Sequence, residues 1–379
     1  MGKEKLTFSV IGCGFWAQYQ IAAWKELPEA ELVAVCDIDP EKAKSTAQKY
    51  GVAHAFTNAR EMLRQIKPDF VDIITPVETH LDFVKLAADH QVPVICQKPL
   101  APDISTAHEM VSYCHSAGVP LFVHENFRWQ APMRRIREIL LAGTIGEVFK
   151  ANVSFCSAFP VFENQPFLAE IEKFIIADVG SHVLDVARYL MGEVRNLRCL
   201  TRRVNPDIKG EDVANVLLEM QSGAHCYVEM SYASILEKEV FPQTLILLEG
   251  KRGSLRLGPD FQLSITTREG TKHEKVAPPI YEWVNPDYAV VQSSMVAINR
   301  DFLQVLQQGQ PADLVEPGQP HRLRQQEQGE HPQGAGGERG GPAPGEEAVE
   351  GQEHHGGPEP GGGVGVRGAV VAGQEEGGQ

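Results

Sequence analysis

The feature that most constrains the fold is an alternation of two hydrophobic patterns over the first 126 residues. Short apolar runs of strand length alternate with segments in which apolar residues recur at helical spacing. The runs cover residues 6–11, 31–36, 70–75, 92–96 and 120–124, and the helical segments cover 15–26, 40–50, 59–66, 79–90 and 103–116. This alternation predicts βαβ units, and therefore an α/β Rossmann domain with a doubly wound parallel sheet.

The pattern changes in the second half of the chain. After a predicted helix over 132–141, closed by Gly143, apolar and polar residues alternate in the runs 148–155, 197–204, 212–220, 224–233 and 244–249. Such runs are typical of strands with one packed and one solvated face. Turn sequences at 221–223 and 251–253 join neighbouring runs as hairpins. We expect an α+β domain with a large open, mostly antiparallel sheet.

The last 65 residues, 315–379, differ in composition from everything before them. They contain only nine residue types, and they hold 19 of the 35 glycines. A segment with so little to bury cannot offset the entropy lost on ordering, so we expect a low-complexity disordered tail. The predicted organisation is a first domain at 1–126, a second at 127–314 and this tail at 315–379.

The tail also suggests a hypothesis about the gene. All nine residue types have codons that begin with G or C. In a GC-rich gene nearly all third codon positions are G or C, and a one-base slip moves these bases into the first position. We hypothesise a shifted reading frame near codons 311–315, with a natural Gly/Glu/Gln linker as the alternative. A helix expected after the helix at 293–307 is then missing, and the product could be impaired. Resequencing the coding DNA distinguishes these readings.

Charge and cysteine content exclude several classes of partner. The formal net charge is −15, of which the tail contributes −7, leaving −8 for the remainder. A mildly acidic chain without a basic stripe argues against nucleic acid and anionic membranes. No apolar run can cross a bilayer, and a signal peptide over the first 17 residues would remove the first predicted strand. Seven scattered cysteines without a C-x-x-C pair favour a reduced, cytoplasmic protein without a metal site.

A glycine motif follows the first predicted strand directly. Gly12 and Gly14 begin a G-x-G-x-x-A sequence, in which the backbone can turn tightly and approach a pyrophosphate at a helix N-terminus. Asp37 ends the second predicted strand, where a carboxylate can bind both ribose hydroxyls of an adenosine. Its charge repels a 2′-phosphate, and no Arg occupies positions 38–40, so NAD is favoured over NADP. A glycine turn that binds nothing is the alternative.

Later strand ends supply further candidates, because open α/β sheets bind ligands at the carboxyl ends of their strands. Thr75 and Pro76 end one strand, and Gln97-Lys98-Pro99 ends the next. His80 could contact the cofactor, or could only cap or pack beside it. The complete predicted cofactor set is Gly12, Gly14, Phe15, Trp16, Asp37, Thr75, Pro76, His80, Gln97 and Lys98.

A third motif lies in the second domain, with Asp178, Gly180, His182 and Asp185 spaced as D-x-G-x-H-x-x-D. On a regular helix, the two acids and the histidine share one stripe, beside an apolar stripe that packs. We therefore expect these three polar side chains to point the same way, off the packed surface.

Taken together over residues 6–309, the three motifs resemble the glucose–fructose oxidoreductase, inositol dehydrogenase and MocA family of nicotinamide-dependent dehydrogenases. In that family a Glu-Lys-Pro sequence ends the fifth strand, and its lysine lies between nicotinamide and substrate. Here Gln97 replaces the Glu, so the role of that acid does not transfer. The resemblance implies an NAD-dependent oxidoreductase that transfers a hydride between a sugar or polyol and nicotinamide. It also implies a homo-oligomer formed through the uncovered face of the second sheet.

The expected chemistry follows from the needs of alcohol oxidation. His182 is the candidate base for the hydroxyl proton, because an imidazole exchanges protons near neutral pH, and Asp178 could orient it. Lys98 could stabilise negative charge on the same oxygen. Arg128, Asp178, His182 and Asp185 are the candidate substrate contacts. The alternatives are a solvated histidine, a surface lysine, and a cofactor-binding regulator without turnover.

Overall fold

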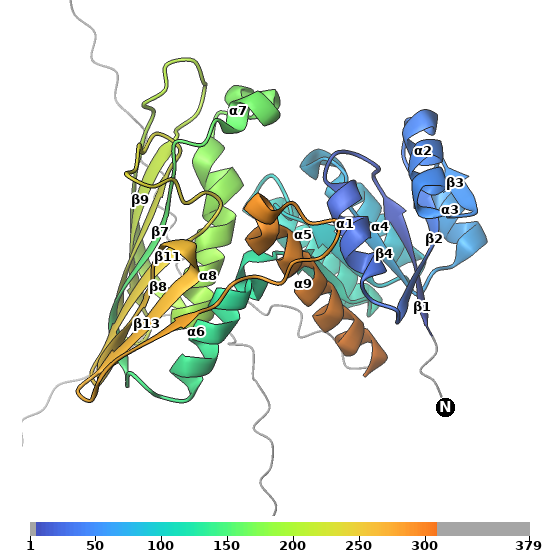
Figure 1. Ribbon diagram of the computed structural model, residues 1–379. Coiled ribbons are helices and arrows are strands. Elements are labelled where there is room, and N and C mark those ends of the chain that lie inside the picture. The colour runs from blue at the N-terminus through green and yellow to red at the C-terminus, as the bar shows by residue number, and fades with distance from the viewer. Residues whose placement is uncertain (1–4, 309–379) are drawn as a thin grey trace, which may run out of the picture. The chain divides into compact units, whose positions relative to one another are not determined.

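The computed structural model describes residues 5–308. Its first sheet, shown in Figure 1, consists of parallel strands throughout. Its strand order is β3-β2-β1-β4-β5-β6. The strands are β1 (Leu6–Ile11), β2 (Ala30–Cys36), β3 (His54–Phe56), β4 (Phe70–Ile73), β5 (Val94–Gln97) and β6 (Leu121–His124). The helices between them are α1 (Ala17–Lys25), α2 (Pro40–Tyr50), α3 (Ala59–Ile66), α4 (His80–Asp89) and α5 (Ile104–Ala117). The predicted doubly wound sheet is confirmed, and β3 is the strand that the prediction missed.

Two apolar clusters cover the two faces of this sheet. One contains Met62, Leu63, Val84 and Met110 from α3, α4 and α5. The other contains α1 residues and the last described helix, α9 (Ala289–Gln307), which lies beside α1. The Phe302 ring of α9 lies 4.4 Å from the ring of Phe122 and 5.0 Å from that of Phe70. Truncating such a buried aromatic typically costs about 3–5 kcal/mol, so α9 contributes substantially to the packing on this face of the first sheet.

The second sheet has eight strands in the order β14-β13-β12-β11-β7-β10-β9-β8, of which only the β7–β10 pair is parallel. The strands are β7 (Val148–Cys156), β8 (Val194–Arg202), β9 (Val213–Met220), β10 (His225–Ser231), β11 (Leu245–Gly250), β12 (Gly253–Leu257), β13 (Gln262–Thr267) and β14 (Gly270–Lys275). Both predicted hairpins are present, joining β9 to β10 and β11 to β12. The prediction of a mostly antiparallel sheet is confirmed.

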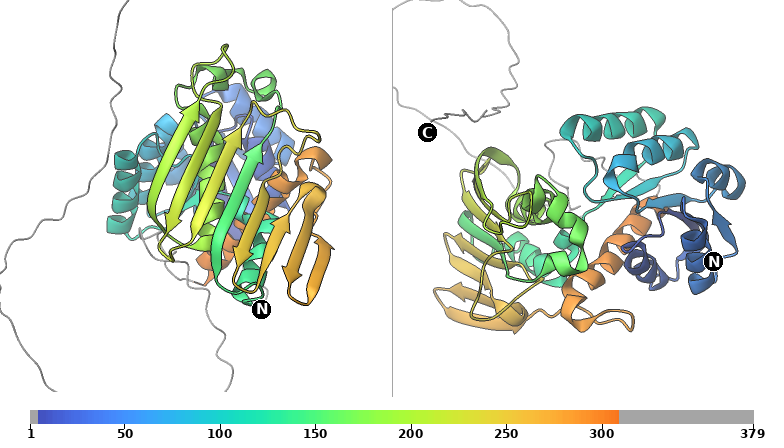
Figure 2. Two further views of the ribbon diagram at one scale, coloured as in Figure 1. Left: turned by 90° about the vertical axis from the view of Figure 1, so that its left-hand side faces the viewer. Right: turned by 90° about the horizontal axis from the view of Figure 1, so that it is seen from above.

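Helices cover one face of this second sheet and leave the other open (Figure 2). On the covered face, α6 (Ala131–Leu141) and α8 (Ser181–Met191) bury an apolar cluster that includes Ile136, Val183 and Val228. The open face shows exposed apolar side chains, among them Leu200, Leu217, Tyr227 and Leu247. The sheet is therefore packed on one side, as its alternating sequence pattern predicts.

Three further observations bear on the expectations above. Within residues 5–308, no helix is long and apolar enough to cross a membrane. All seven cysteines are free. The tail at 315–379, and the frameshift hypothesis with it, concern residues outside the described range.

Candidate active site

The glycine turn after β1 is confined on one side and open on the other. Gly12 has a φ of +100°, and a Cβ there would lie 2.6 Å from the carbonyl oxygen of Ile74, so only glycine fits. A Cβ at Gly14 would meet no atom within 4 Å. The turn thus leaves its backbone accessible where α1 begins, as close approach of a phosphate requires.

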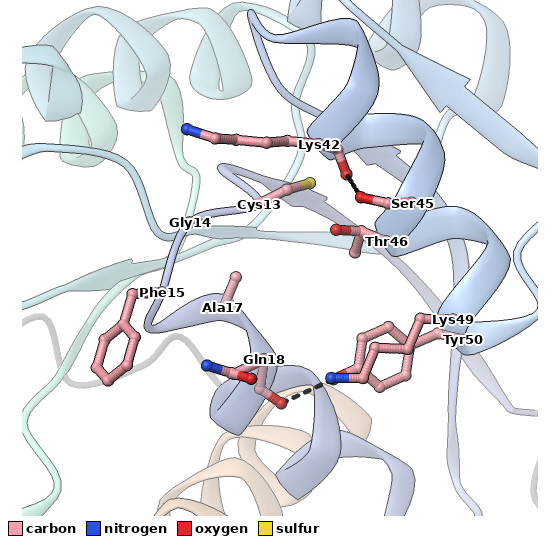
Figure 3. A pocket seen from close by; sticks show the side chains of 10 residues that line it. All are labelled: Cys13, Gly14, Phe15, Ala17, Gln18, Lys42, Ser45, Thr46, Lys49 and Tyr50. Atoms are coloured by element: carbon pink, nitrogen blue, oxygen red, sulfur yellow. Dashed lines mark hydrogen bonds between the residues drawn. The ribbon is translucent and has the colours of Figure 1, made fainter.

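A cavity lies beside this turn (Figure 3), and α2 forms its opposite wall. Its lining residues are Cys13, Gly14, Phe15, Ala17, Gln18, Lys42, Ser45, Thr46, Lys49 and Tyr50. Figure 3 shows the Lys42 side chain extending from α2 toward the turn at Cys13 and Gly14. The α2 wall therefore offers ammonium and hydroxyl groups, which suit an anionic ligand.

Asp37 lies at the carboxyl end of β2 and is held by backbone groups. Its Oδ2 accepts a hydrogen bond from the Cys13 N–H at 2.7 Å, and its Oδ1 accepts one from the Asp39 N–H at 2.9 Å. These bonds tie the acid to the glycine turn and leave further acceptor capacity on both oxygens. The adjacent Ile38 is 92% exposed. An open turn, a fixed acid and an exposed apolar side chain together fit the phosphate, ribose and base of an adenine dinucleotide.

The other residues predicted to contact the cofactor lie in surroundings that differ from one to the next. Phe15 is exposed and its ring contacts those of Trp16 and Tyr19. His80 is enclosed, with Nε2 2.9 Å from the Thr75 carbonyl oxygen and Nδ1 3.1 Å from that of Leu100. His80 thereby connects the loops that follow β4 and β5. Direct contacts of Phe15, Trp16, Thr75, Pro76 and His80 with a cofactor stay predictions.

Lys98 follows β5 and reaches the second domain. Its Nζ lies 3.5 Å from Asp178 Oδ1 and donates a hydrogen bond to the Asp178 carbonyl oxygen at 3.3 Å. Asp178 Oδ2 accepts from the hydroxyl of Tyr232 at 3.3 Å. Burial, and then the Asp178 carboxylate, raise the pKa of Tyr232 well above its ordinary value, so this hydroxyl stays protonated as a donor. The two domains meet at this lysine–carboxylate pair.

The acid that contacts His182 is Glu125, and the expectation that Asp178 orients this histidine is corrected. The cause is a π-helical turn over Ile176–Gly180, immediately before α8. A π turn contains more residues than an α turn, so Asp178 does not share a regular α-helical stripe with His182. As a result the carboxylate of Asp178 faces Lys98 and Tyr232.

Glu125 lies just after β6, and its Oε1 is 2.6 Å from His182 Nδ1. The same oxygen accepts the N–H of Phe127 at 3.1 Å, and the Phe127 ring stacks on the imidazole with centroids 3.9 Å apart. Burial acts to raise the pKa of Glu125, but His182, the Phe127 N–H and Lys98 outweigh it, so the pKa lies below its ordinary value. Glu125, whose side chain is 13% exposed, is thus a carboxylate that holds the imidazole in place.

Arg128 and Asp185, both candidate substrate contacts, are paired with each other. The Arg128 Nε donates to Asp185 Oδ2 at 2.7 Å, and Nη2 donates to Oδ1. Burial acts to lower the pKa of Arg128, but the Asp185 carboxylate outweighs it, and the pKa is raised. This bidentate pair fixes η2 (Phe127–Trp129) on α8. Substrate contacts by either residue stay predictions.

Gln97 points into the first domain. It is 6% exposed, and its amide contacts Gln20 and the backbone N–H of Lys98. A direct cofactor contact through this side chain stays a prediction.

Sequence reasoning assigned no role to three polar residues near these groups: Lys42, Tyr232 and Glu125, although the segment 124–129 after the last predicted strand of the first sheet was expected to line the cleft. The position of Lys42 on the first turn of the helix that follows Asp37, the acid predicted to bind ribose, was an available signal. The partners of Glu125 and Tyr232 had no such signal, because each side chain contacts a residue more than 50 positions away.

Comparisons with known proteins agree with this geometry. Residues 6–125 match the model of the "Oxidoreductase family, NAD-binding Rossmann fold", and residues 133–256 match the "GFO/IDH/MocA C-terminal domain". The chain is 43% identical to a D-apiose dehydrogenase of Rhizobium rhizogenes, over 82% of this chain and 90% of that protein. It is 44% identical to a D-apiose dehydrogenase of Paraburkholderia graminis, over 79% and 80% of the two chains.

A solved structure is also similar over most of the chain. It is an oxidoreductase from Agrobacterium radiobacter in complex with NAD+, L-tartaric acid and magnesium, with 42% identity and a TM-score of 0.80. The similarity covers 82% of this chain and 91% of that one. The chain belongs to the GFO/IDH/MocA family of oxidoreductases. It is an NAD-dependent dehydrogenase that acts on the hydroxyl group of a sugar or related compound.

Proposed function

We propose that His182 is the base of this dehydrogenase and that D-apiose is its substrate. The observation that supports the base is the 2.6 Å contact between His182 Nδ1 and Glu125. When Nδ1–H donates to this carboxylate, the lone pair of the neutral imidazole lies on Nε2. Within residues 5–308, Nε2 forms no hydrogen bond to the protein, so it is available for a substrate hydroxyl.

The reaction divides between the bound cofactor and the side chains. The nicotinamide of NAD+, when bound, would supply the acceptor for the hydride that leaves the carbinol carbon. His182 Nε2 takes the hydroxyl proton, so that the C–OH becomes C=O and the imidazole becomes imidazolium. Lys98, held by Asp178, donates a hydrogen bond to the same oxygen while negative charge develops on it. Tyr232 fixes the other oxygen of Asp178, so the lysine has a defined position.

The substrate proposal rests on two relatives that are 43% and 44% identical and are named D-apiose dehydrogenases. The test is the appearance of NADH absorbance when purified protein receives NAD+ and each member of a panel of pentoses, hexoses and polyols. We expect D-apiose to give the highest kcat/KM. Higher kcat/KM for another sugar overturns the substrate. NAD binding without turnover on any member favours the regulator.

We further propose a cofactor domain at 1–126 and a substrate domain at 127–314. We also propose a cytoplasmic location, which the seven free cysteines support.

A homo-oligomer formed through the open sheet face is a further proposal, because that face exposes several large apolar side chains. The test is the mass in solution by light scattering. Leu200→Glu combined with Leu217→Glu should give monomers, and an unchanged mass excludes this face.

A further inference from the structure

A buried row of three side chains leads from the backbone of Lys98 into the first domain. The Lys98 N–H donates to Gln97 Oε1 at 2.7 Å, and Gln97 Nε2 donates to Gln20 Oε1 at 2.6 Å. Gln20 Nε2 then donates to both oxygens of Asp72, at 2.7 and 2.8 Å. Gln20 and Asp72 are completely buried, and Gln97 nearly so. Every hydrogen bond in the row therefore points toward Asp72.

Asp72 is the only charged member of this row. Trp24 Nε1 donates a further bond to its Oδ2 at 2.8 Å, and no Lys, Arg or His within residues 5–308 forms an ion pair with it. Burial raises the pKa of Asp72 to about 7, although the bonds from Trp24 and Gln20 act to lower it. Because both oxygens face donors, the carboxylate form is the one that these partners satisfy.

Because every bond points toward Asp72, that end of the row needs a group that only accepts. The two positions between Asp72 and Lys98 need amides, which can both donate and accept. Gln97 must accept from Lys98 and donate to Gln20, which a carboxylate in its place cannot do. We propose that Asp72, Gln20 and Gln97 form a one-charge relay, in which the carboxylate of Asp72 fixes the orientation of two amides and thereby the backbone of Lys98. This inference rests on the proposed function of Lys98. Asp72, Gln20 and Gln97 are positioning residues in it.

The relay makes an unusual prediction about paired substitutions. Gln97→Glu places a second acceptor opposite Gln20 Oε1, and turning the Gln20 amide only moves the repulsion to Asp72. Asp72→Asn introduces a donor at the other end, and turning both amides to suit it presents a donor to the Lys98 N–H. In the double variant the carboxylate and the amide have exchanged places. Turning Gln20 alone then satisfies every group in the row.

The experiment is a double-mutant cycle at pH 8 with wild type, Gln97→Glu, Asp72→Asn and both together. Three properties are measured for each: the urea midpoint, kcat with the best substrate, and deuterium exchange of the peptide that contains Lys98. Each single variant should lower the midpoint, lower kcat by about tenfold or more, and speed the exchange. The double variant should recover most of each loss.

A control separates the relay from net charge alone. Asp72→Asn combined with Gln262→Glu, at an exposed position on β13 opposite Lys275, restores the charge without restoring the relay, and should recover nothing. If Gln97→Glu yields no soluble protein, recovery of soluble protein in the double variant becomes the readout, and its failure overturns the relay.

The outcomes distinguish three failures. Additive losses in the cycle overturn the relay. Recovery of the midpoint without recovery of kcat or of exchange protection overturns the positioning role and leaves a structural one. If none of the sugars tested lets the wild type reduce NAD+, the proposed function fails. The urea midpoint and the deuterium exchange then still decide whether the relay exists.

Discussion

His182 and Glu125 are 57 residues apart in the sequence, yet Nδ1 of the imidazole lies 2.6 Å from Oε1 of the carboxylate. Phe127, two residues after Glu125, stacks on the same ring with an interplanar angle of 9°. The histidine is thus held by an acid and an aromatic ring from one short segment after β6. The catalytic proposal depends on this arrangement, because it leaves Nε2 to face the substrate.

Glu125→Gln tests the acid. The amide oxygen can still accept from Nδ1, but it does not stabilise an imidazolium, so we expect kcat to fall about 10–100-fold. Glu29→Gln, at an exposed position, is the matched control. An unchanged kcat in Glu125→Gln would contradict the role given to Glu125.

Lys98→Met tests stabilisation of the substrate oxygen. We expect a loss of about 100-fold or more in kcat/KM, because one hydrogen-bond donor to a developing oxyanion is worth that much in other enzymes. NADH affinity, measured by fluorescence titration, should change far less. Lys44→Met, on the exposed side of α2, should leave both quantities unchanged. Equal losses of affinity and turnover would instead place Lys98 in cofactor binding alone.

Asp37→Ser tests cofactor choice. The carboxylate is held by the Cys13 and Asp39 N–H groups at the end of β2, and hydrogen bonds to a charged group contribute about 1.5–3 kcal/mol. The KM for NAD+ should therefore rise about 10–100-fold, and the preference over NADP+ should shrink because the repelling charge is gone. A variant that keeps the full preference would show that other groups select the cofactor.

His124→Gln tests acid stability at the junction between β6 and α9. Burial lowers the pKa of His124 from 6.5 to about 4, although the bond from its Nε2 to Asn299 Oδ1 acts in the opposite direction. The unfolded chain therefore takes up this proton before the folded one. Stability contributed above pH 6.5 is lost as the pH falls toward 4, by at most about 3 kcal/mol. Between pH 7 and 4.5, the free energy of unfolding measured in urea should fall less for the variant than for the wild type. An equal fall in both proteins would exclude His124 as a source of acid instability.

Local signals explain which parts of the fold were predictable. The predicted bounds of α2 match the structure because Asp39 caps the helix, Pro40 begins it and Gly51 ends it with a φ of +68°. The strand β3 was missed because it has three residues, two of them exposed. The packing of α9 beside α1 joins residues at opposite ends of the described chain, and no pattern within either helix encodes it.

In the candidate site, too, features with a local sequence signal were predictable and contacts between distant segments were not. The glycine turn and Asp37 follow from spacing along one βαβ unit. The partners of His182 and Lys98 could not be predicted, because regular helical spacing assumes that the turn before α8 is an α turn. The π turn over Ile176–Gly180 breaks that assumption and gives Asp178 and His182 different partners.

The most direct test of the account compares wild type with His182→Ala in NADH formation from D-apiose and NAD+, alongside NADH affinity for both proteins. We predict NADH formation by the wild type and a loss of about 10²–10⁴-fold in kcat for the variant, the range for removal of a general base, with affinity for NADH preserved. A variant that keeps the wild-type kcat would contradict the assignment of His182 as the base.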